Sequence, residues 1–445
     1  MTSVQVEAKQ NSWNQSITLR LRQSFLVDIL CIAFLLLFNL FWRVPFVKVA
    51  KSIGVISGPL IPSAALLISQ LTGVSADQLA VYLVALGQFF GVISFYFFLR
   101  ELTGRRLPGL MVAFFYSLPV GFLALENTRF AFIMGDGAHV AALGLFPVTC
   151  YLLLSFLKRG RARFGLGASF GMSLVALISS FAVFNLFLLM VVILFSEIIL
   201  GRVKVKLARF LFVSLMSFGL FSFWYTPGTL LSLISSGQGR MIVGLFGKLL
   251  PLSFFVAPVF LVIAYLVFES REGLQPIALA VFFLVIYLFL NLIEYLAYAD
   301  VAKYVLLPHR FLPELAFSLA FFLGIAVTIL LDAFSEFYPK GNYLLLESEM
   351  GGQTKRGISL LLLITIWLIG MALVYFLLPT DSILSEIKSI PANGITIERF
   401  WVGCHQLCFR YCSSRVDNLV AVGISLISFL SVIFLVGLAS KKRLV

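Results

Sequence analysis

Residues 78–99 read QLAVYLVALGQFFGVISFYFFL, an unbroken apolar stretch that ends at Arg100. A helix of about 20 residues, rising ~1.5 Å per residue, crosses the ~30 Å of hydrocarbon in a bilayer. Similar stretches recur along the chain, for example at 311–332 and 418–440, with short polar segments between them. The sequence therefore predicts a helical protein that crosses a membrane many times.

The composition agrees with this pattern. Of the 445 residues, 61% are hydrophobic and 12% are charged, far from the balance of a soluble domain. The net charge of +13 could suggest nucleic acid. However, about two thirds of the 33 Lys and Arg residues lie in alternate loops, as expected of cytoplasmic segments. We expect membrane lipids but no nucleic acid as partners, a plasma-membrane location, and both termini in the cytoplasm.

We predict an all-α, polytopic bundle of about 12 spans. The predicted spans are 24–42, 78–99, 107–125, 138–157, 165–181, 183–200, 207–226, 249–268, 276–296, 311–332, 357–378 and 418–440. The apolar run 165–200 would extend ~54 Å as one helix, so we divide it near Ser179 and Asn185. Residues 42–77 contain too many Pro and Gly for a span, and we expect an external loop with a short interfacial helix near 64–71.

Three parts are predicted along the chain. Residues 1–332 form a module of about ten spans, 333–356 a polar cytoplasmic connector, and 357–445 two further spans around the external loop 379–417. That loop contains Cys404, Cys408 and Cys412. Their spacing matches no common zinc signature, so free thiols, one disulfide and a metal site are all left open. Cys31 and Cys150 lie in apolar spans and are interpreted as packing residues.

Ionisable residues inside spans are candidates for function. Two acids, Asp28 and Glu197, are predicted to lie clearly within spans. Each is close to a span end, within reach of Arg22 and Arg202 respectively, and is interpreted as an anchor that pairs with basic neighbours. With no acid recognised in the middle of a span, the sequence disfavours a proton-coupled pump.

The second predicted external loop, 126–139, is rich in ionisable side chains. They are Glu126, Arg129, Asp136 and His139. Together they could bind a divalent metal or a phosphate, or act as acid and base. The alternative is that Asp136 caps a helix beginning near Ala138, with His139 merely in its first turn.

The loop that precedes the span at 311–332 offers a second group of candidates. Arg310 could bind a phosphate, because a guanidinium presents two parallel donors to such oxygens. His309 lies beside it, and Arg240, alone in the Gly/Ser-rich loop 227–248, is a weaker candidate of the same kind. The alternative is nonspecific contact with lipid head groups. No Walker loop, dinucleotide fingerprint or nucleophile elbow is present, so no nucleotide-driven chemistry is indicated.

Several short motifs resemble those of a known superfamily. They are FYFFLRELTGRR at 95–106, AFFYSLP at 113–119, LFP at 145–147 and PHRFL at 308–312. In the order of these motifs and apolar stretches, the chain resembles the GT-C superfamily of membrane glycosyltransferases, which use polyprenyl-phosphate-linked sugars. It is especially similar to membrane proteins labelled as 6-pyruvoyl-tetrahydropterin-synthase-related. The resemblance covers roughly residues 25–330.

The resemblance implies an external active site that faces a lipid-linked sugar donor. The family's catalytic acid usually lies in the first external loop, but residues 43–76 contain no Asp or Glu. Glu126 or Asp136 would then act as base or metal ligand, and Arg310 as phosphate clamp, provided that loops 126–139 and 297–314 converge. The alternatives are a catalytically silent scaffold of an envelope assembly and a transporter or flippase for a lipid-linked glycan. The sugar, the acceptor, the cofactor and the oligomeric state are not determined by the sequence.

Overall fold

The computed structural model describes residues 3–51, 53, 58–119, 123–133, 135–226, 275–298, 311–337 and 415–441. Every helix or strand element within these ranges is an α-helix, so the predicted all-α class is confirmed for this part of the chain. The helices are α1 (Ser3–Val49), α2 (Leu60–Thr72), α3 (Ala76–Thr103), α4 (Arg106–Ser117), α5 (Ala124–Phe132), α6 (Gly137–Leu143), α7 (Phe146–Arg159), α8 (Ala162–Ile178), α9 (Ser180–Ile199), α10 (Val203–Phe221), α13 (Gln275–Tyr298), α14 (Leu312–Phe337) and α18 (Arg415–Lys441).

Within the described ranges, 5 stretches are long and apolar enough to span a membrane. They are Leu26–Val49 in α1, Ala76–Thr103 (α3), Gly137–Arg159 (α6 with α7), Ser180–Ile199 (α9) and Leu312–Leu331 in α14. Shorter apolar helices accompany them in α2, α8, α13 and α18. The chain is therefore built as a multi-pass membrane protein, but these helices do not make up 12 spans. The predicted spans 249–268 and 357–378 lie outside the described residues.

The predicted span 107–125 is wrong as a single helix. Helix α4 has only 12 residues and ends at Ser117, and a separate helix, α5, begins at Ala124. Leu118 is extended, with ψ 119°, as is usual for a residue that precedes a proline. The Leu118-Pro119 pair therefore interrupts a stretch whose hydropathy alone looks continuous.

The division of the run 165–200 is confirmed. Helix α8 ends at Ile178, Ser179 is extended (φ −150°, ψ 122°), and α9 begins at the next residue. The hydroxyl of Ser179 accepts a hydrogen bond from the backbone N–H of Ala182 at 3.3 Å and so caps α9. A serine that bonds to a nearby backbone N–H stabilises the start of a helix, which explains why the break falls here.

The segment between the first two spans holds a short helix, as predicted, but this helix extends beyond the predicted residues 64–71. Helix α2 has 13 residues and ends at Gly73, whose φ of 73° is costly for any residue with a side chain. Ile61 and Ala65 are buried, whereas Leu71 is 79% exposed. One face of α2 thus packs on the bundle and the other faces outward.

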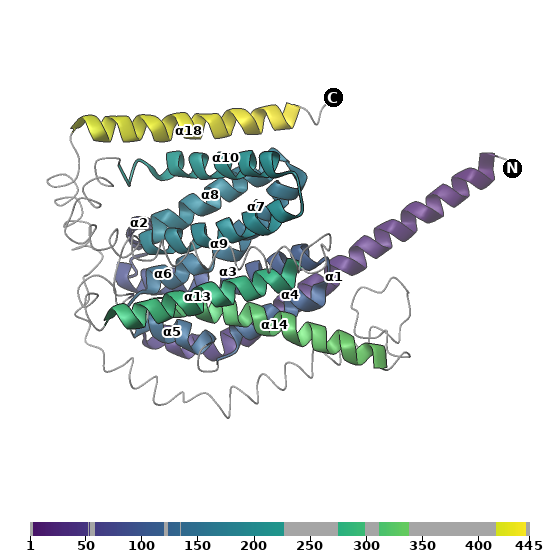
Figure 1. Ribbon diagram of the computed structural model, residues 1–445, viewed down its shortest axis with the longest axis horizontal. Helices are drawn as coiled ribbons and strands as arrows, with labels where there is room; N and C mark the ends of the chain where they lie inside the picture. Colours follow the sequence, from purple (N-terminus) through teal and green to yellow (C-terminus); the bar gives the residue numbers. More distant parts are fainter. Residues whose placement is uncertain are drawn as a thin grey trace.

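Helix α3 lies at the centre of the bundle, in contact with α1, α2, α4, α6, α7 and α13 (Figure 1). A Cβ added to Gly87 would lie 2.9 Å from the Cα of Ala141, and one added to Gly91 would lie 2.9 Å from the Cα of Gly144. Ser94 also donates a hydrogen bond to the carbonyl of Gly144 at 3.0 Å. Small residues allow this close approach, which membrane helices need because lipid tails supply no hydrophobic driving force.

Helix α18, near the C-terminus, packs against α10 (Figure 1). The hydroxyls of Ser222 and Ser425 lie 2.9 Å apart, and Ser425 also donates to the carbonyl of Gly219 at 2.9 Å. The predicted final span therefore packs against the same bundle as the preceding helices.

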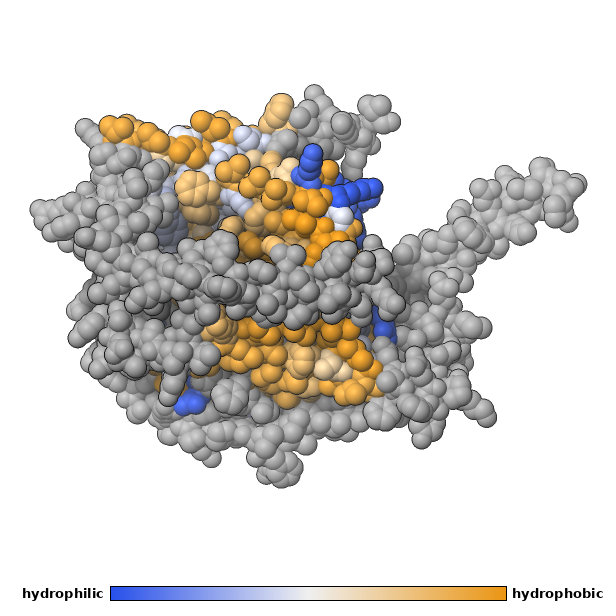
Figure 2. All heavy atoms as spheres, in the orientation of Figure 1, coloured by the Kyte–Doolittle hydropathy of each residue, from blue (hydrophilic) through white to orange (hydrophobic). Residues whose placement is uncertain are grey.

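Large apolar side chains cover the outside of the bundle. Leu37, Leu215 and Leu419, on three different helices, are 63%, 71% and 71% exposed. On the face shown in Figure 2, hydrophobic atoms cover most of the described part, and the strongly hydrophilic atoms lie at its margins. Such an exterior is expected where lipid tails take the place of water.

Candidate functional site

Charged side chains inside the bundle gather at its two ends. The span Gly137–Arg159 runs from His139 at one end to Arg159 at the other, and α9 runs from Asn185 near its start to Glu197 near its last turn. We call the end with Arg159 and Glu197 the basic end, and the end with His139 the histidine end. The loop charges predict that the basic end faces the cytoplasm.

Asp28 forms the first ion cluster of the basic end. Its carboxylate, on α1, accepts hydrogen bonds from Arg100 of α3 at 2.8 Å and from Arg106 of α4 at 2.7 Å. The hydroxyl of Tyr96 donates to the same carboxylate at 2.8 Å. The predicted anchoring role is confirmed, but its partners come from neighbouring helices, whereas the side chain of the expected partner Arg22 lies outside the described part. The cluster ties three helices together.

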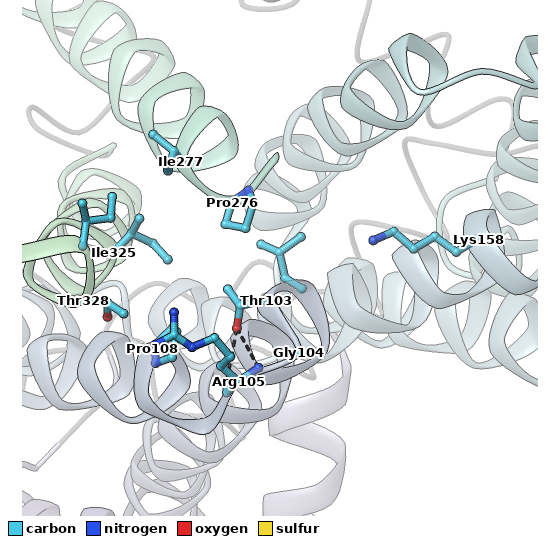
Figure 3. Close-up of a pocket in the computed structure, with 11 residues that line it drawn as sticks. Thr103, Gly104, Arg105, Pro108, Lys158, Pro276, Ile277, Ile325 and Thr328 are labelled. Atoms are coloured by element: carbon cyan, nitrogen blue, oxygen red, sulfur yellow. Dashed lines mark hydrogen bonds between the residues drawn. The ribbon is translucent and has the colours of Figure 1, made fainter. Parts of the chain in front are cut away.

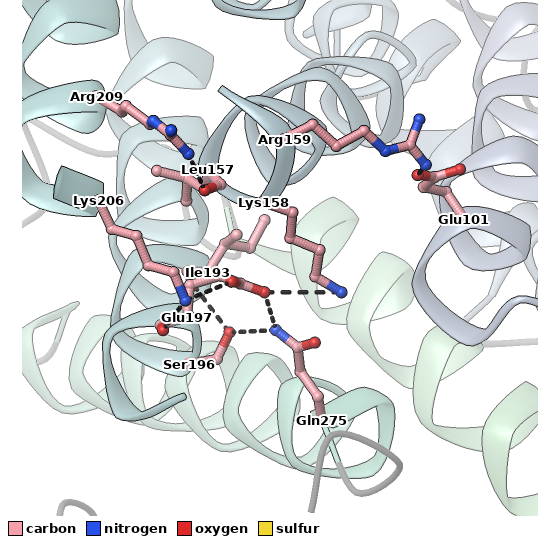
Figure 4. A network of polar contacts seen from close by, with 10 residues as sticks. All are labelled: Glu101, Leu157, Lys158, Arg159, Ile193, Ser196, Glu197, Lys206, Arg209 and Gln275. Carbon is pink, nitrogen blue, oxygen red and sulfur yellow. Dashed lines mark hydrogen bonds and ion pairs between the residues drawn. The ribbon is translucent and has the colours of Figure 1, made fainter. Parts of the chain in front are cut away.

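Glu197 forms the second ion cluster of this end (Figure 4). The Nζ of Lys206 lies 2.9 Å from its Oε2, and the Nζ of Lys158 lies 3.8 Å from its Oε1. The amide of Gln275 donates to Oε1 at 2.6 Å and to the hydroxyl of Ser196 at 3.2 Å. The buried carboxylate is thus balanced by two cations, so the predicted pairing with basic neighbours is present, but Lys206 and Lys158 are the partners in place of the expected Arg202. Lys158 precedes the α8–α9 pair in sequence and Lys206 follows it, and both contact the same carboxylate. The basic loops before and after this pair therefore lie at one end of the bundle, as predicted.

A pocket of about 510 Å³ opens beside this cluster (Figure 3). Its lining is contributed by α3, α4, α7, α13 and α14, and consists of Leu102, Thr103, Gly104, Arg105, Pro108, Lys158, Pro276, Ile277, Ile325, Thr328 and Ile329. Lys158 is already shared with Glu197, and Thr103 donates its hydroxyl hydrogen to the carbonyl of Leu99 at 2.7 Å. The pocket is amphipathic, but these two polar groups are engaged with the protein.

His139 and Glu314 form a buried pair at the histidine end. The Nε2 of His139, in α6, lies 2.9 Å from the Oε1 of Glu314, in the first turn of α14, and both side chains are 0% exposed. Asn185 of α9 donates its amide to the same carboxylate oxygen. Its main-chain carbonyl accepts a hydrogen bond from the hydroxyl of Tyr287, on α13, at 3.2 Å. Four helices thus meet around one carboxylate.

The described ends of two predicted external loops come together at this pair. The ring of Phe181 lies 5.1 Å from that of His139 and 5.0 Å from that of Phe311, between ring centroids. The start of α6 and the start of α14 therefore lie side by side. The convergence that the resemblance required of loops 126–139 and 297–314 is present at the described ends of these loops.

A buried cation lies in the same half of the bundle. Arg43 of α1 is 2% exposed, donates to the Oε1 of Gln88 at 3.1 Å, and stacks 4.8 Å from the ring centroid of Trp42. Arg43 lies near the end of the span Leu26–Val49 that is opposite to Asp28, and therefore in the half of the bundle that holds His139 and Glu314.

The residues predicted in loop 126–139 lie mostly in helices. Glu126 and Arg129 belong to α5, and Asp136 occupies the position before the first residue of α6. The position of the predicted cap is therefore correct, but the side chain of Asp136 makes no capping hydrogen bond. Asp136 is instead fully buried, three residues before His139.

The remaining predicted residues cannot be placed. Arg310, His309 and Arg240, together with Cys404, Cys408 and Cys412, lie outside the described residues. In the described ranges no group of three or more His, Cys, Asp or Glu side chains could hold a metal, so Asp136 and His139 are not joined there by a third ligand. Cys31 and Cys150 are buried free thiols, in agreement with the predicted packing role.

Glu314 was not predicted as a site residue. The prediction of Asp28 and Glu197 as the acids within spans is wrong, because Glu314 also lies in a span, Leu312–Leu331, and is fully buried. An acid in the first turn of a helix is common, since it offsets the helix dipole. The burial of Glu314 follows from the packing of α6 and α9 against it, through His139 and Asn185.

No protein-family model matches the chain, and no curated protein matches it. Among solved structures it is similar to the oligosaccharyltransferase of Archaeoglobus fulgidus in its apo form, with a TM-score of 0.39 and 12% sequence identity. The alignment covers 87% of this chain and 58% of that chain, so this protein spans little more than half the length of that enzyme.

Proposed function

We propose that this protein is a membrane glycosyltransferase that transfers a sugar from a polyprenyl-phosphate donor at the histidine end of the bundle. The class of reaction follows from the resemblance of residues 25–330 to the GT-C superfamily. The site follows from one observation: His139 and Glu314, from segments far apart in sequence, form a buried pair at 2.9 Å. The loop charges predict that this end faces away from the cytoplasm.

Transfer to a hydroxyl acceptor requires a base. In the proposed mechanism His139 accepts the proton of the acceptor hydroxyl while the hydroxyl oxygen attacks the sugar carbon and the phosphate leaves. Glu314 orients the imidazole and stabilises the imidazolium that forms. Asp136, three residues earlier, and Glu126, in the preceding helix, are the alternative bases.

The departing phosphate requires a positive charge nearby. Arg310 lies two residues before the first residue of α14, Leu312. We propose it as the phosphate clamp because its guanidinium can bind two phosphate oxygens at once. Arg129 on α5 and His309 are proposed as further contacts to the donor, and Arg240 as a more distant one.

The test is incubation of the purified protein with labelled polyprenyl-phosphate sugars, with donor consumption as the readout. His139→Gln and Asp136→Asn should each remove activity without loss of folded protein, and Arg310→Lys should weaken donor binding. Glu101→Gln is the matched control, because Glu101 pairs with Arg159 at the basic end. Full activity in His139→Gln would remove the pair from the chemistry, and a wild-type protein that consumes none of the donors would contradict the transferase.

A second candidate function is transport of a lipid-linked glycan across the membrane. A transporter needs polar groups within its spans, and Arg43, His139 and Glu314 supply buried ones in the apolar bundle. Vesicles containing the purified protein would distinguish the two functions, because a transporter moves the labelled lipid to the other leaflet without consuming it. A silent scaffold, suggested by the acid-free residues 43–76, would do neither.

A further inference from the structure

Arg43 is buried without a counter-charge. Its side chain is among the largest fully buried ones of the described chain, and no Asp or Glu of the described residues forms an ion pair with it. Its protein partners are the side-chain oxygen of Gln88 and the ring of Trp42. A guanidinium does not lose its proton in a protein, so the charge cannot be removed by titration. A lone charge in an apolar interior is unfavourable unless a ligand compensates it.

Three N–H groups around this cation have no acceptor. The Nε of Arg43, the Nε2 of Gln88 and the Nε1 of Trp42 are buried, and none of them makes a hydrogen bond. The guanidinium and the indole can only donate, and the oxygen of Gln88 already accepts from Nη1 of Arg43. Because nearly all buried polar groups in native proteins are paired, three unpaired donors beside one cation indicate a missing acceptor.

The nearest polar residue on α1 does not supply this acceptor. Asn39, one helical turn before Arg43, donates its amide to the hydroxyl of Ser117 and to the carbonyl of Leu35, both at 2.8 Å. Its Oδ1 is buried and accepts no hydrogen bond, so it does not serve the donors of Arg43 or Trp42. The acceptor must therefore come from outside this group of side chains.

The geometry points to a site for a phosphate group held by Arg43, Gln88 and Trp42. A planar guanidinium fork matches the oxygens of a phosphate, and the neighbouring N–H groups add donors without adding a negative charge. In a membrane protein this anion has two sources, the head group of a lipid phosphate and free inorganic phosphate. The site does not depend on the proposed reaction, because a transferase and a transporter of a lipid phosphate would both use it.

The first experiment measures binding to the purified full-length protein in a neutral detergent. Inorganic phosphate and a polyprenyl phosphate in mixed micelles are added separately, and both thermal unfolding and direct binding are recorded. At least one of them should bind and raise the midpoint of unfolding. Arg43→Gln should weaken that binding by about tenfold or more, because charge-assisted hydrogen bonds are lost.

The matched control is Arg163→Gln. The guanidinium of Arg163 stacks 4.8 Å from the ring centroid of Phe164, the same distance as Arg43 from Trp42, but at the basic end. This variant should bind phosphate as the wild type does. A difference between the two variants would therefore report the site rather than the loss of one positive charge.

Two further variants keep the test decisive if Arg43→Gln does not fold. Gln88→Glu places a carboxylate next to Arg43, so it should raise the midpoint of unfolding without ligand and remove the response to phosphate. Trp42→Phe keeps an aromatic ring but removes one N–H, and should weaken binding severalfold.

The outcomes separate clearly. A response to the lipid phosphate alone assigns the site to a lipid head group, and a response to both forms assigns it to the phosphate group itself. A response to inorganic phosphate alone assigns it to the free ion. A wild-type protein that binds neither form, or a Gln88→Glu variant that binds as the wild type does, overturns the inference. None of these measurements requires catalytic turnover, so an inactive protein would leave the result intact.

Discussion

The basic end and the histidine end both bury charged side chains, but Asp28 and Glu197 at the basic end are balanced within the described chain, whereas Arg43 at the histidine end is not. At the basic end Asp28 meets two guanidinium groups and Glu197 meets two ammonium groups. At the histidine end Arg43 has no carboxylate partner among the described residues, and the Oε2 of Glu314 accepts no hydrogen bond. A cluster whose charges are paired within the protein holds helices together. A cluster with unpaired polar atoms has donors and acceptors that a ligand can use.

Replacement of Glu314 should have the largest effect on function. Glu314→Gln keeps the size of the side chain but removes the charge that supports His139, so the rate of donor consumption should fall by about 10²- to 10⁴-fold. Circular dichroism and thermal unfolding should show a folded protein. If the variant unfolds instead, the histidine end is structural in the same sense as the basic end, and the distinction between them is lost.

Replacement of Asp28 should have the largest effect on stability. Asp28→Ala leaves Arg100 and Arg106 without their shared acid, and removal of one partner from a buried ion pair costs about 3–5 kcal/mol. Equilibrium unfolding in detergent would measure this loss, while activity per folded molecule should not change. A loss below about 1 kcal/mol, typical of exposed pairs, would show that the cluster does not join the helices.

The Glu197 cluster offers a graded test within the basic end. Lys206 lies 2.9 Å from the carboxylate with 10% of its side chain exposed, whereas Lys158 lies at 3.8 Å with 37% exposed. Lys206→Gln should therefore lower the free energy of unfolding by about 1.5–3 kcal/mol, the range for a hydrogen bond to a charged group. Lys158→Gln should cost less, and the reverse order would contradict the geometry.

The smallest effect is expected at the surface. Arg159 and Glu101 form an ion pair with 44% and 24% of their side chains exposed. Glu101→Gln should lower the free energy of unfolding by less than about 1 kcal/mol, and the difference should shrink as salt is added. A large loss that does not depend on salt would show that charge pairs at this end are stronger than their exposure implies.

Much of the fold could be predicted from local sequence. The break at Ser179 was predicted because a single helix would be too long for the bilayer, and the serine cap confirms it. The break after Ser117 was missed because hydropathy does not register a single Leu-Pro step. Arg43 was assigned to an external loop, whereas α1 continues to Val49 and places Arg43 inside the span.

The candidate site was predicted in outline and missed in detail. The two loops that were expected to converge do so at their described ends, but through Glu314, which was not a candidate. The sequence marked Asp136 and His139 because ionisable residues clustered there. Glu314 was not marked although it lies four residues after Arg310, and Asn185 was used only to divide an apolar run, because nothing along the chain shows that the two side chains meet.

The sequence by itself determined that this is a helical membrane protein, because the length and polarity of each apolar stretch are local properties. Only the tertiary structure decided which charges are paired. Asp28 and Arg100, which form a hydrogen bond, are 72 positions apart in sequence, and Asn185 and Glu314 are 129 positions apart. Charge compensation acts through space over a few ångströms, so the contrast between the balanced basic end and the unbalanced histidine end exists only once the helices have packed.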